Sequence, residues 1–500
     1  MHFTPLPATD HPAWLTQALL QLPPIPSAEL PDWCVLDALP PLPVGPHRLS
    51  DPVLRQLLRS LQTSPLDSPD ALLRAVRQHL SRPQLDDFAV HLLHAWHQHG
   101  AAPQHAWLLR AVASLGDTAA IDCLAHLIPA LPSPVRTLAL ESLAASPAPL
   151  ALLYLLLLAR RAGSLLREQI LPLLVRLARQ RNLALADLDD LALPDLGFQP
   201  DGGPWFDHGR RRFQAVLAPG ASVLLRDAHG HLRPTLPPRA TPASRTRWFR
   251  LRRQVRAFLR LHSLRLGDAL VEGRRWNPRL FRARLLAHPL LAHLARSLLW
   301  GAYDDRGRLI TPFRISEDAT FLDADESPVP WLDINSIRLV HPIELPDAVC
   351  SAWQTSWTDH QLVPPFPQLT RPVVRLTDTD ARAITTYRDG RLRADLLART
   401  LRRDGWEPLP AEPGRPREMH TRLFATWGVG VVLHHRTLGP ASPNDPRPSQ
   451  ELTAAWFLCP ADLRDPLADV TDALPLGQVP PLLVSEMHLL LRRLHARTPH

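Results

Sequence analysis

Residues 272–315 read EGRRWNPRLFRARLLAHPLLAHLARSLLWGAYDDRGRLITPFRI, and the change of pattern inside this stretch decides the fold class. Apolar residues in its first half recur at helical spacing, with an interruption at His288-Pro289, where proline cannot continue a helix. After Trp300 the apolar residues fall in short alternating segments around the turn Asp305-Arg306-Gly307, which is typical of strands. A helix that gives way to short strands predicts an α+β region.

The chain after this stretch continues to mix both element types. Strands are predicted at 297–304, 308–315, 336–345, 423–436 and 453–460, and helices at 345–360, 392–405 and 480–497. Residues 246–500 are therefore expected to form a C-terminal α+β domain with an antiparallel sheet.

Two further elements are predicted directly before this stretch. Residues 193–245 contain three short strand patterns separated by turns at Pro219-Gly220 and His229-Gly230, which indicates a small β-meander connector. The segment 245–273 then predicts one long amphipathic helix. Its apolar face is expected to contain Trp248, Leu251, Val255, Phe258, Leu259, His262 and Leu266.

The N-terminal part is predicted to be helical and repetitive. Residues 51–192 contain eight helical patterns joined by short loops, several of which begin with Asp or Ser followed by Pro. Paired helices of this kind predict an α-solenoid of HEAT-like repeats. Residues 1–50 form a Pro-rich segment with a single predicted helix at 11–22.

Length and composition bound the class of protein. Five hundred residues predict more than one domain. The sequence contains no lysine, which excludes P-loop, Schiff-base and kinase-type lysine chemistry. Four well-separated cysteines, the absence of a signal-peptide pattern and an apolar run at 150–159 that is too short for a bilayer predict a soluble cytoplasmic protein without a membrane partner.

Charge is distributed unevenly along the chain. Residues 205–300 contain 20 arginines and four acidic residues, a net charge of +16, while the rest of the chain carries −8. Guanidinium groups suit phosphates and carboxylates, so this segment predicts a surface for an anionic partner such as nucleic acid. The candidate anion-binding residues are Arg252, Arg253, Arg256, Arg260, Arg274, Arg275 and Trp276. The alternative is internal neutralisation by the eight acids at 302–333.

Candidates for catalysis and for metal binding are few. His341, together with Glu317, Asp318 and Arg371, is the group that we would assign to acid–base chemistry if a cleft brings these side chains together. The alternative is a satisfied core histidine with structural ion pairs. The histidines at 91, 94, 97 and 99 spiral around a predicted helix, so neither a metal site nor a cofactor is predicted.

Several short blocks resemble the bacterial MolR-like family, which carries the domain of unknown function 4132 and includes molybdate metabolism regulator-type proteins. The blocks are ALVEGRRW (269–276), AHPLLAHLARSLLWGAYD (287–304), PFRISED (312–318), RLVHPIEL (338–345), PPFPQLTRPV (364–373) and VPPLLVSEMHLLL (479–491). The resemblance covers roughly residues 150–500 and implies no reaction. Some members add a WGR module associated with nucleic acids, but here Trp427-Gly428 is followed by Val429, so no such module is expected.

Two functions of different classes follow from these patterns. We expect a non-catalytic cytoplasmic scaffold or regulator that presents its arginines to an anionic partner, with a further protein partner on the helical repeats. The alternative is an enzyme that acts on nucleotides or nucleic acid at a site near His341, Asp318 and Arg371.

Overall fold

The computed structural model describes residues 3–22, 30–161, 163–209, 211–220, 222–330, 334–409, 418–442, 445–464 and 470–497. The chain forms two compact units. Unit 1 comprises Met1–Gly197, Pro204–Gln214 and Leu225–Leu261, and unit 2 comprises Phe198–Gly203, Ala215–Leu224 and His262–His500. The predicted segments 1–50, 51–192, 193–245 and 246–500 divide the chain by element type instead, and that division stays a prediction.

The first fifty residues form one helix and a very small sheet. Helix α1 spans Ala13–Leu20, inside the predicted range 11–22. Strand β3 (His47–Arg48) pairs parallel to β1 (Thr4–Pro5) and antiparallel to β2 (Pro43–Val44). These strands are only two residues long, because proline lacks the backbone N–H that would extend the ladder.

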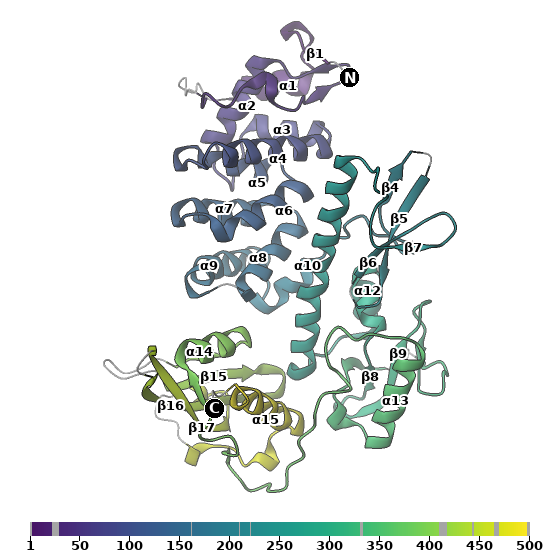
Figure 1. Ribbon diagram of the computed structural model, residues 1–500, viewed down its shortest axis with the longest axis vertical. Helices are drawn as coiled ribbons and strands as arrows, with labels where there is room; N and C mark the ends of the chain where they lie inside the picture. The colour runs from purple at the N-terminus through teal and green to yellow at the C-terminus, as the bar shows by residue number, and fades with distance from the viewer. Residues whose placement is uncertain are drawn as a thin grey trace. The chain divides into compact units, whose positions relative to one another are not determined.

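A run of helices occupies the rest of the N-terminal region (Figure 1). Proline lies in the first turn of α2, α4 and α7, where the backbone N–H has no helical partner in any case. Helices two apart along the chain pack together: α4 with α6, α5 with α7, α6 with α8, and α7 with α9. The predicted helical character of this region is therefore confirmed. The helices are α2 (Asp51–Thr63), α3 (Ala71–His79), α4 (Arg82–Gln98), α5 (Arg110–Ser114), α6 (Thr118–Leu127), α7 (Ser133–Ala145), α8 (Pro149–Arg161) and α9 (Ser164–Gln180).

The predicted β-meander is present as a four-stranded sheet with the order β4-β5-β6-β7. Its strands are β4 (Trp205–His208), β5 (Arg211–Ala218), β6 (Ser222–Arg226) and β7 (Leu232–Arg233). Gly220 and Gly230 occupy the two predicted turns with φ of 71° and 85°, a region of backbone space that favours glycine. Both turns lie where they were predicted, but the first of the three predicted strand patterns forms two strands, β4 and β5.

Helix α10 (Pro242–Glu272) follows the meander and is 31 residues long. All seven residues of its predicted apolar face are buried, and Val255, Phe258 and His262 have no exposed surface. The helical period therefore identified the packed face correctly. One of the boundaries between the two units falls within this helix, after Leu261.

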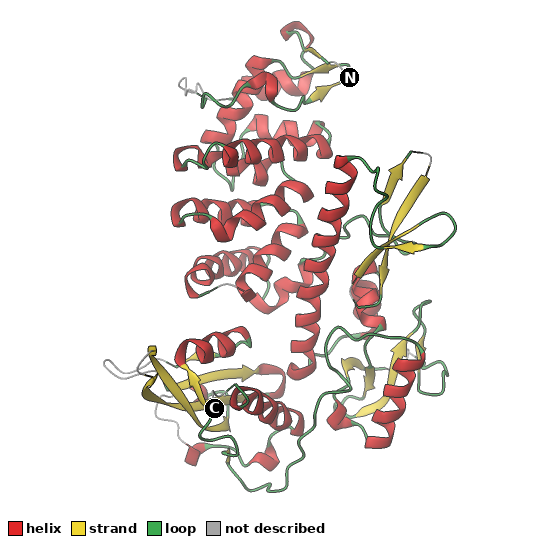
Figure 2. Cartoon of the chain, viewed as in Figure 1, coloured by secondary structure: helices red, strands yellow, loops and turns green. Residues whose placement is uncertain are grey.

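The first part of unit 2 confirms the change of pattern at residues 272–315 (Figure 2). A short helical segment with a π-helical turn at Phe281–Leu286 stops at His288, whose Nδ1 accepts the N–H of Leu291 at 3.4 Å and so caps α12. Antiparallel strands then form a sheet with the order β10-β9-β8-β11. The elements are α11 (Pro278–Leu280), α12 (Pro289–Arg296), β8 (Trp300–Tyr303), β9 (Leu309–Ile315), β10 (Phe321–Leu322), β11 (Ser336–Leu339) and α13 (Asp347–Asp359).

A second antiparallel sheet in unit 2 has the order β12-β17-β16-β15-β14, with β13 also paired to β17. Helices α14 and α15 contribute buried leucines to the apolar core at this sheet. The elements are β12 (Ala383–Ile384), β13 (Arg391–Arg393), α14 (Ala394–Arg403), β14 (Glu407–Pro408), β15 (Met419–Phe424), β16 (Val429–Ser442), β17 (Asp445–Leu458) and α15 (Pro481–His495). The α+β class with antiparallel sheets is confirmed.

One predicted strand is wrong. Residues 423–436 were expected to form a single strand, but the chain turns back at Ala425–Trp427, and Phe424 pairs with Val429 across a hairpin. Gly428 makes this turn possible because its φ of 61° is strained for other residues.

Candidate functional site

Five exposed residues form a continuous line along α10, and we call them the arginine stripe: Arg245, Phe249, Arg253, Arg256 and Arg260. They follow one another at intervals of three or four residues, which places them on one face of a helix. Phe249 is 61% exposed in spite of its apolar ring. All five residues belong to unit 1.

The side chain of Arg253 is held in place by a buried acid. Its guanidinium forms an ion pair with Asp122 of α6, and the Nε–Oδ1 hydrogen bond measures 3.2 Å. The Asp122 side chain is completely buried and also accepts the hydroxyl of Tyr154. Burial lowers the pKa of Arg253 and raises the pKa of Tyr154. Since a buried carboxylate needs a charged partner, Arg253 is primarily structural.

Arg256 and Arg260 differ from Arg253, because neither side chain makes a hydrogen bond or ion pair with another residue in the described part of the chain. Arg252 is half-buried and lies over the ring of Trp248 at 5.7 Å from its centroid. Among the predicted anion-binding residues of α10, Arg256 and Arg260 are therefore the two best placed to meet a partner from solvent.

The remaining predicted anion-binding residues lie in unit 2. Trp276 is half-buried, exchanges backbone hydrogen bonds of 2.9 Å with Ile337 and packs edge-on against Trp300. The guanidinium of Arg274 lies 5.5 Å from the centroid of the Trp276 ring. Arg275 is exposed and lies so close to Gly307 that a Cβ at that position would be 2.6 Å from its Nη2. Trp276 therefore serves the core here and is not a free stacking platform.

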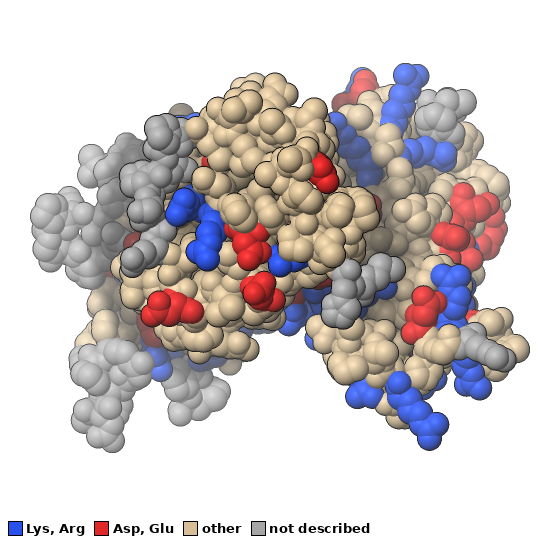
Figure 3. All heavy atoms as spheres, turned by 90° about the horizontal axis from the view of Figure 1, so that it is seen from above, with Lys and Arg blue, Asp and Glu red and all other residues tan. Residues whose placement is uncertain are grey.

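Two of the acids at 302–333 form ion pairs with residues near their own position in the chain. Asp304 pairs with Arg308 at 2.8 Å, and Glu326 pairs with Arg314 and, at 3.0 Å, with His360. Asp333 lies outside the described residues. On the face shown in Figure 3, arginines occur in separate groups interspersed with acidic side chains. The local pairs offer no support for neutralisation of α10 by these acids.

His341 and Arg371 meet through a residue that the sequence patterns did not indicate. The carboxylate of Glu486 in α15 lies 3.0 Å from His341 Nε2 and 2.6 Å from Arg371 Nε. His341 Nδ1 accepts the N–H of Ile343 at 3.1 Å, so Nε2 carries the ring N–H and donates a hydrogen bond to Glu486. The imidazole is completely buried.

Glu317 and Asp318 lie apart from this network, in the turn between β9 and β10. Both are exposed. Asp318 accepts hydrogen bonds from Ser316 and from the N–H of Thr320, and these bonds hold its pKa below the usual range. The backbone carbonyl of Glu317 accepts from Arg296 at 2.8 Å. Of the four residues predicted to act together, the structure joins His341 and Arg371 and gives Glu317 and Asp318 other partners.

A second buried ion pair lies directly beside His341 in the chain. Arg338 is 3% exposed and pairs with Glu344, which also accepts the hydroxyl of Tyr303 at 3.1 Å and the N–H of His341 at 3.0 Å. The guanidinium lies 4.1 Å from the Tyr303 ring centroid and 5.1 Å from that of Trp427. Burial, followed by the nearby Glu344 charge, raises the pKa of Tyr303. These residues bind strand β11 to its neighbours.

Neither a metal-binding cluster nor a membrane-spanning helix occurs in the part of the chain that the structure describes. Among the described residues, no three His, Cys, Asp or Glu side chains are grouped so that they could hold a metal ion. No helix in the described ranges combines the length and the apolar character that crossing a bilayer requires.

These features define an α+β protein with a helical N-terminal region, antiparallel sheets and an arginine-lined central helix. Residues 230–406 match the family model described as "Domain of unknown function (DUF4132)". The predicted resemblance to this domain is therefore confirmed for residues 230–406, which lie within its expected span of 150–500.

Comparison with curated proteins gives one similar sequence that is itself uncharacterized. The protein YehI of Escherichia coli K12 is 27% identical over 342 residues, which make up 65% of this chain and 28% of YehI. The chain thus spans little more than a quarter of the length of this relative. No solved structure matches the chain.

Proposed function

We propose that the protein is a non-catalytic cytoplasmic scaffold or regulator that binds nucleic acid through the arginine stripe of α10. The observation that carries this proposal is the exposure of Arg256 and Arg260, which have no partner in the described part of the chain. A guanidinium without an intramolecular acid keeps its N–H donors for phosphate oxygens.

The arrangement of the stripe suits a strand of nucleic acid. Arg260 lies fifteen positions after Arg245, so the stripe is roughly 22 Å long at 1.5 Å per residue. Phe249 adds an exposed ring between charged neighbours, and bases stack on such rings without regard to sequence. The proposed partner is therefore a single strand, with its phosphates on Arg256 and Arg260 and a base on Phe249.

The helical region supports the scaffold part of the proposal. Packing between helices two apart along the chain is the arrangement expected of HEAT-like solenoid repeats. Solenoids offer extended surfaces to other proteins, so a protein partner on these helices completes the proposed role.

Fluorescence anisotropy with a labelled single-stranded oligonucleotide, measured at several salt concentrations, tests this function. We expect binding that weakens as salt rises, with log K falling by about 0.7 per log salt for each phosphate neutralised on a single strand. The double variant Arg256→Glu/Arg260→Glu should reduce the affinity roughly tenfold or more and make the salt slope shallower.

A matched control comes from another helix of unit 1. Arg176 and Arg179 of α9 are exposed and one turn apart, so Arg176→Glu/Arg179→Glu changes the net charge equally. This variant should bind within about twofold of the unchanged protein, since non-specific charge effects are screened over roughly 8–10 Å. Equal losses in both variants, or no binding by the unchanged protein, would refute the stripe as the interface.

The alternative function, an enzyme acting on nucleotides or nucleic acid near His341, Asp318 and Arg371, has less support. His341 is fully buried and both of its ring nitrogens are bonded, while Asp318 is engaged in its own turn. Electrophoresis of the oligonucleotide after incubation separates the two functions. Intact oligonucleotide agrees with a scaffold, whereas cleavage that is lost in His341→Gln would favour the enzyme.

A further inference from the structure

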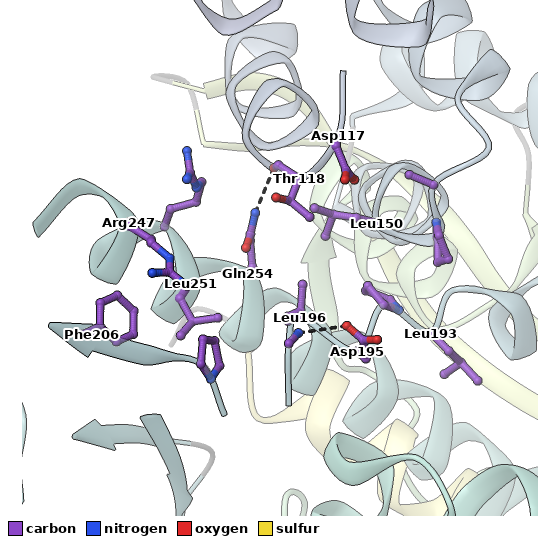
Figure 4. Close-up of a pocket in the computed structure, with 16 residues that line it drawn as sticks. Asp117, Thr118, Leu150, Leu193, Asp195, Leu196, Phe206, Arg247, Leu251 and Gln254 are labelled. Atoms are coloured by element: carbon purple, nitrogen blue, oxygen red, sulfur yellow. Dashed lines mark hydrogen bonds between the residues drawn. The ribbon is translucent and has the colours of Figure 1, made fainter. Parts of the chain in front are cut away.

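Unit 1 contains a cavity of about 450 Å³ (Figure 4). Its wall is built from the starts of helices α6 and α8, the segment 193–197, the beginning of the meander and one face of α10. This volume lies within the range of roughly 300–1,000 Å³ that is usual for small-molecule sites in proteins. The cavity residues differ from Arg253, Arg256 and Arg260 of the stripe.

Most of the cavity wall is apolar. The apolar lining comes from prolines, leucines and one phenylalanine, including Leu150, Leu193, Leu196, Phe206 and Leu251. Gln254 lines the cavity too, and its amide donates to the carbonyl of Thr118 at 2.9 Å. A ligand that fills this space therefore needs an apolar body.

Two arginines of α10 give one side of the cavity a positive charge. The guanidinium of Arg247 lies 4.9 Å from the centroid of the Phe206 ring and donates to the carbonyl of Trp205 at 3.2 Å. Stacking fixes the plane of the group while its remaining N–H donors stay available, a geometry suited to a carboxylate. Arg250, which also lines the cavity, is half-buried.

Two acids lie on the other side. Figure 4 shows Arg247 and Phe206 on one side of the cavity, and Asp117 and Asp195 on the other. Burial together with the nearby Asp86 raises the pKa of Asp117, although the charge of Arg82, a hydrogen bond from the Thr118 N–H and the charge of Arg77 act in the opposite direction. Asp195 accepts the N–H of Gly197 with only one carboxylate oxygen, at 2.9 Å. Cationic groups are favoured here, since both carboxylates gain from a positive neighbour.

The helix start at this side is not an anion site. The carboxylate of Asp86 already accepts the backbone N–H groups of Asp117, Ala119 and Ala120 at 2.7–2.9 Å. A second anion would meet the charge of Asp86 in addition to those of Asp117 and Asp195. The negative group of a ligand therefore belongs at the arginine side.

We propose that this cavity binds a small zwitterion with an apolar body, namely a short peptide with both termini free. The carboxylate of the peptide meets Arg247 and Arg250, its side chains fill the leucine-lined centre, and its ammonium group meets Asp117 and Asp195. Opposite charges at the two sides of an apolar cavity carry this assignment, which is independent of nucleic-acid binding by the arginine stripe.

Isothermal titration calorimetry of the full chain with the dipeptide Leu-Leu tests the proposal. We expect saturable binding at one site, together with weaker binding of two blocked analogues. N-acetyl-Leu-Leu loses the ammonium group, and Leu-Leu-amide loses the carboxylate. Each analogue should bind at least about tenfold more weakly than Leu-Leu, because one charge-assisted contact is lost.

Variants then assign the two sides of the cavity. Arg250→Gln should weaken Leu-Leu about tenfold and leave the affinity for Leu-Leu-amide nearly unchanged, while Asp117→Asn should weaken Leu-Leu and spare N-acetyl-Leu-Leu. Ala148→Phe fills the cavity and should abolish binding of all three probes. Circular dichroism checks that each variant is folded, and Arg176→Gln on α9 is the control that should bind normally.

Three outcomes would overturn the proposal. They are the absence of Leu-Leu binding to the unchanged, folded protein, equal binding of the free and blocked peptides, and binding that survives Ala148→Phe. A failure of oligonucleotide binding has no bearing on these results, since the arginines of the stripe tested there do not line the cavity.

Discussion

Several buried charges in unit 2 have a specific partner of opposite charge, and Glu486 is one that binds two such partners. Its side chain is 11% exposed. One carboxylate oxygen contacts His341, and both oxygens contact Arg371. Burial alone would raise the pKa of Glu486, but the hydrogen bond from His341 and the charge of Arg371 outweigh burial and hold the pKa below its usual range. The carboxylate therefore joins three segments that are distant in sequence.

Glu486→Gln is expected to lower the free energy of unfolding by about 2–4 kcal/mol, because Arg371 would lose its counter-charge in a largely buried setting. Urea denaturation monitored by circular dichroism measures the change. The control is Arg375→Gln, whose 3.5 Å ion pair with Asp347 joins side chains that are 58% and 98% exposed. That variant should stay within about 0.5 kcal/mol of the unchanged protein.

The same residue predicts a pH dependence with a definite sign. A carboxyl whose pKa is lower in the folded than in the unfolded state stabilises the fold above its unfolded pKa, and this contribution disappears as the pH falls through the folded pKa. The stability difference between the unchanged protein and Glu486→Gln should therefore shrink on acidification from neutral pH to about pH 3. A difference that stays constant over this range would contradict the ion-pair account.

Single residues also show what a sequence can and cannot predict. The segment His341-Pro342-Ile343-Glu344 has the spacing of a capping box, with His341 as the N-cap and Glu344 three residues later, so this local pair could have been predicted. Glu486 lies 145 residues after His341, and no local pattern connects the two. Long-range partners of this kind are set by packing of whole elements, which sequence spacing does not encode.

Helix α10 carries a buried and an exposed aromatic residue side by side, so its contributions to stability and to surface binding can be tested separately. Trp248 is 1% exposed and packs edge-on against Phe206, whereas its neighbour Phe249 is 61% exposed. Trp248→Ala should cost about 3–5 kcal/mol through loss of buried area and the cavity that it leaves. Phe249→Ala should change stability by no more than about 0.5 kcal/mol.

Oligonucleotide binding should depend on Phe249 more strongly than on Trp248. Phe249→Ala should weaken binding of a single strand by about 1–3 kcal/mol, which is the usual contribution of one stacked base. Thermal unfolding and anisotropy on both variants measure the two effects. If Phe249→Ala destabilises the fold as strongly as Trp248→Ala, the outward face of α10 is a packing surface and not a binding surface.

Elements with a regular period were predictable, and those that depend on one backbone angle were not. The buried face of α10 follows directly from apolar spacing, which a helix translates into one surface. The prediction of one strand at 423–436 was wrong because apolar residues continue on both sides of Gly428 and give no sign of the hairpin turn. Alternation alone cannot distinguish one long strand from two that pair.

For the whole molecule, the continuous helix α10 has a consequence for unfolding. Val255 and Phe258 are buried in the part assigned to unit 1, and Leu266 and Leu270 are buried in the part assigned to unit 2. Loss of either unit would remove packing from one part of the helix and fray the turns beside it, since helix formation is cooperative. The chain should therefore unfold in one calorimetric transition in spite of its two units.

A flexible linker of about eight Gly and Ser residues inserted between Leu261 and His262 should separate this transition into two, because such a linker propagates no helix while each unit keeps its own buried segment. The same linker inserted after Gly230, in the exposed turn between β6 and β7, lengthens the chain equally and should leave a single transition. Differential scanning calorimetry distinguishes these cases. One undivided transition in both insertion variants would show that α10 is not the sole link, since strands β5 and β6 also cross the division. Two transitions in the unchanged protein would show that a continuous helix is too weak a link to make the units unfold together.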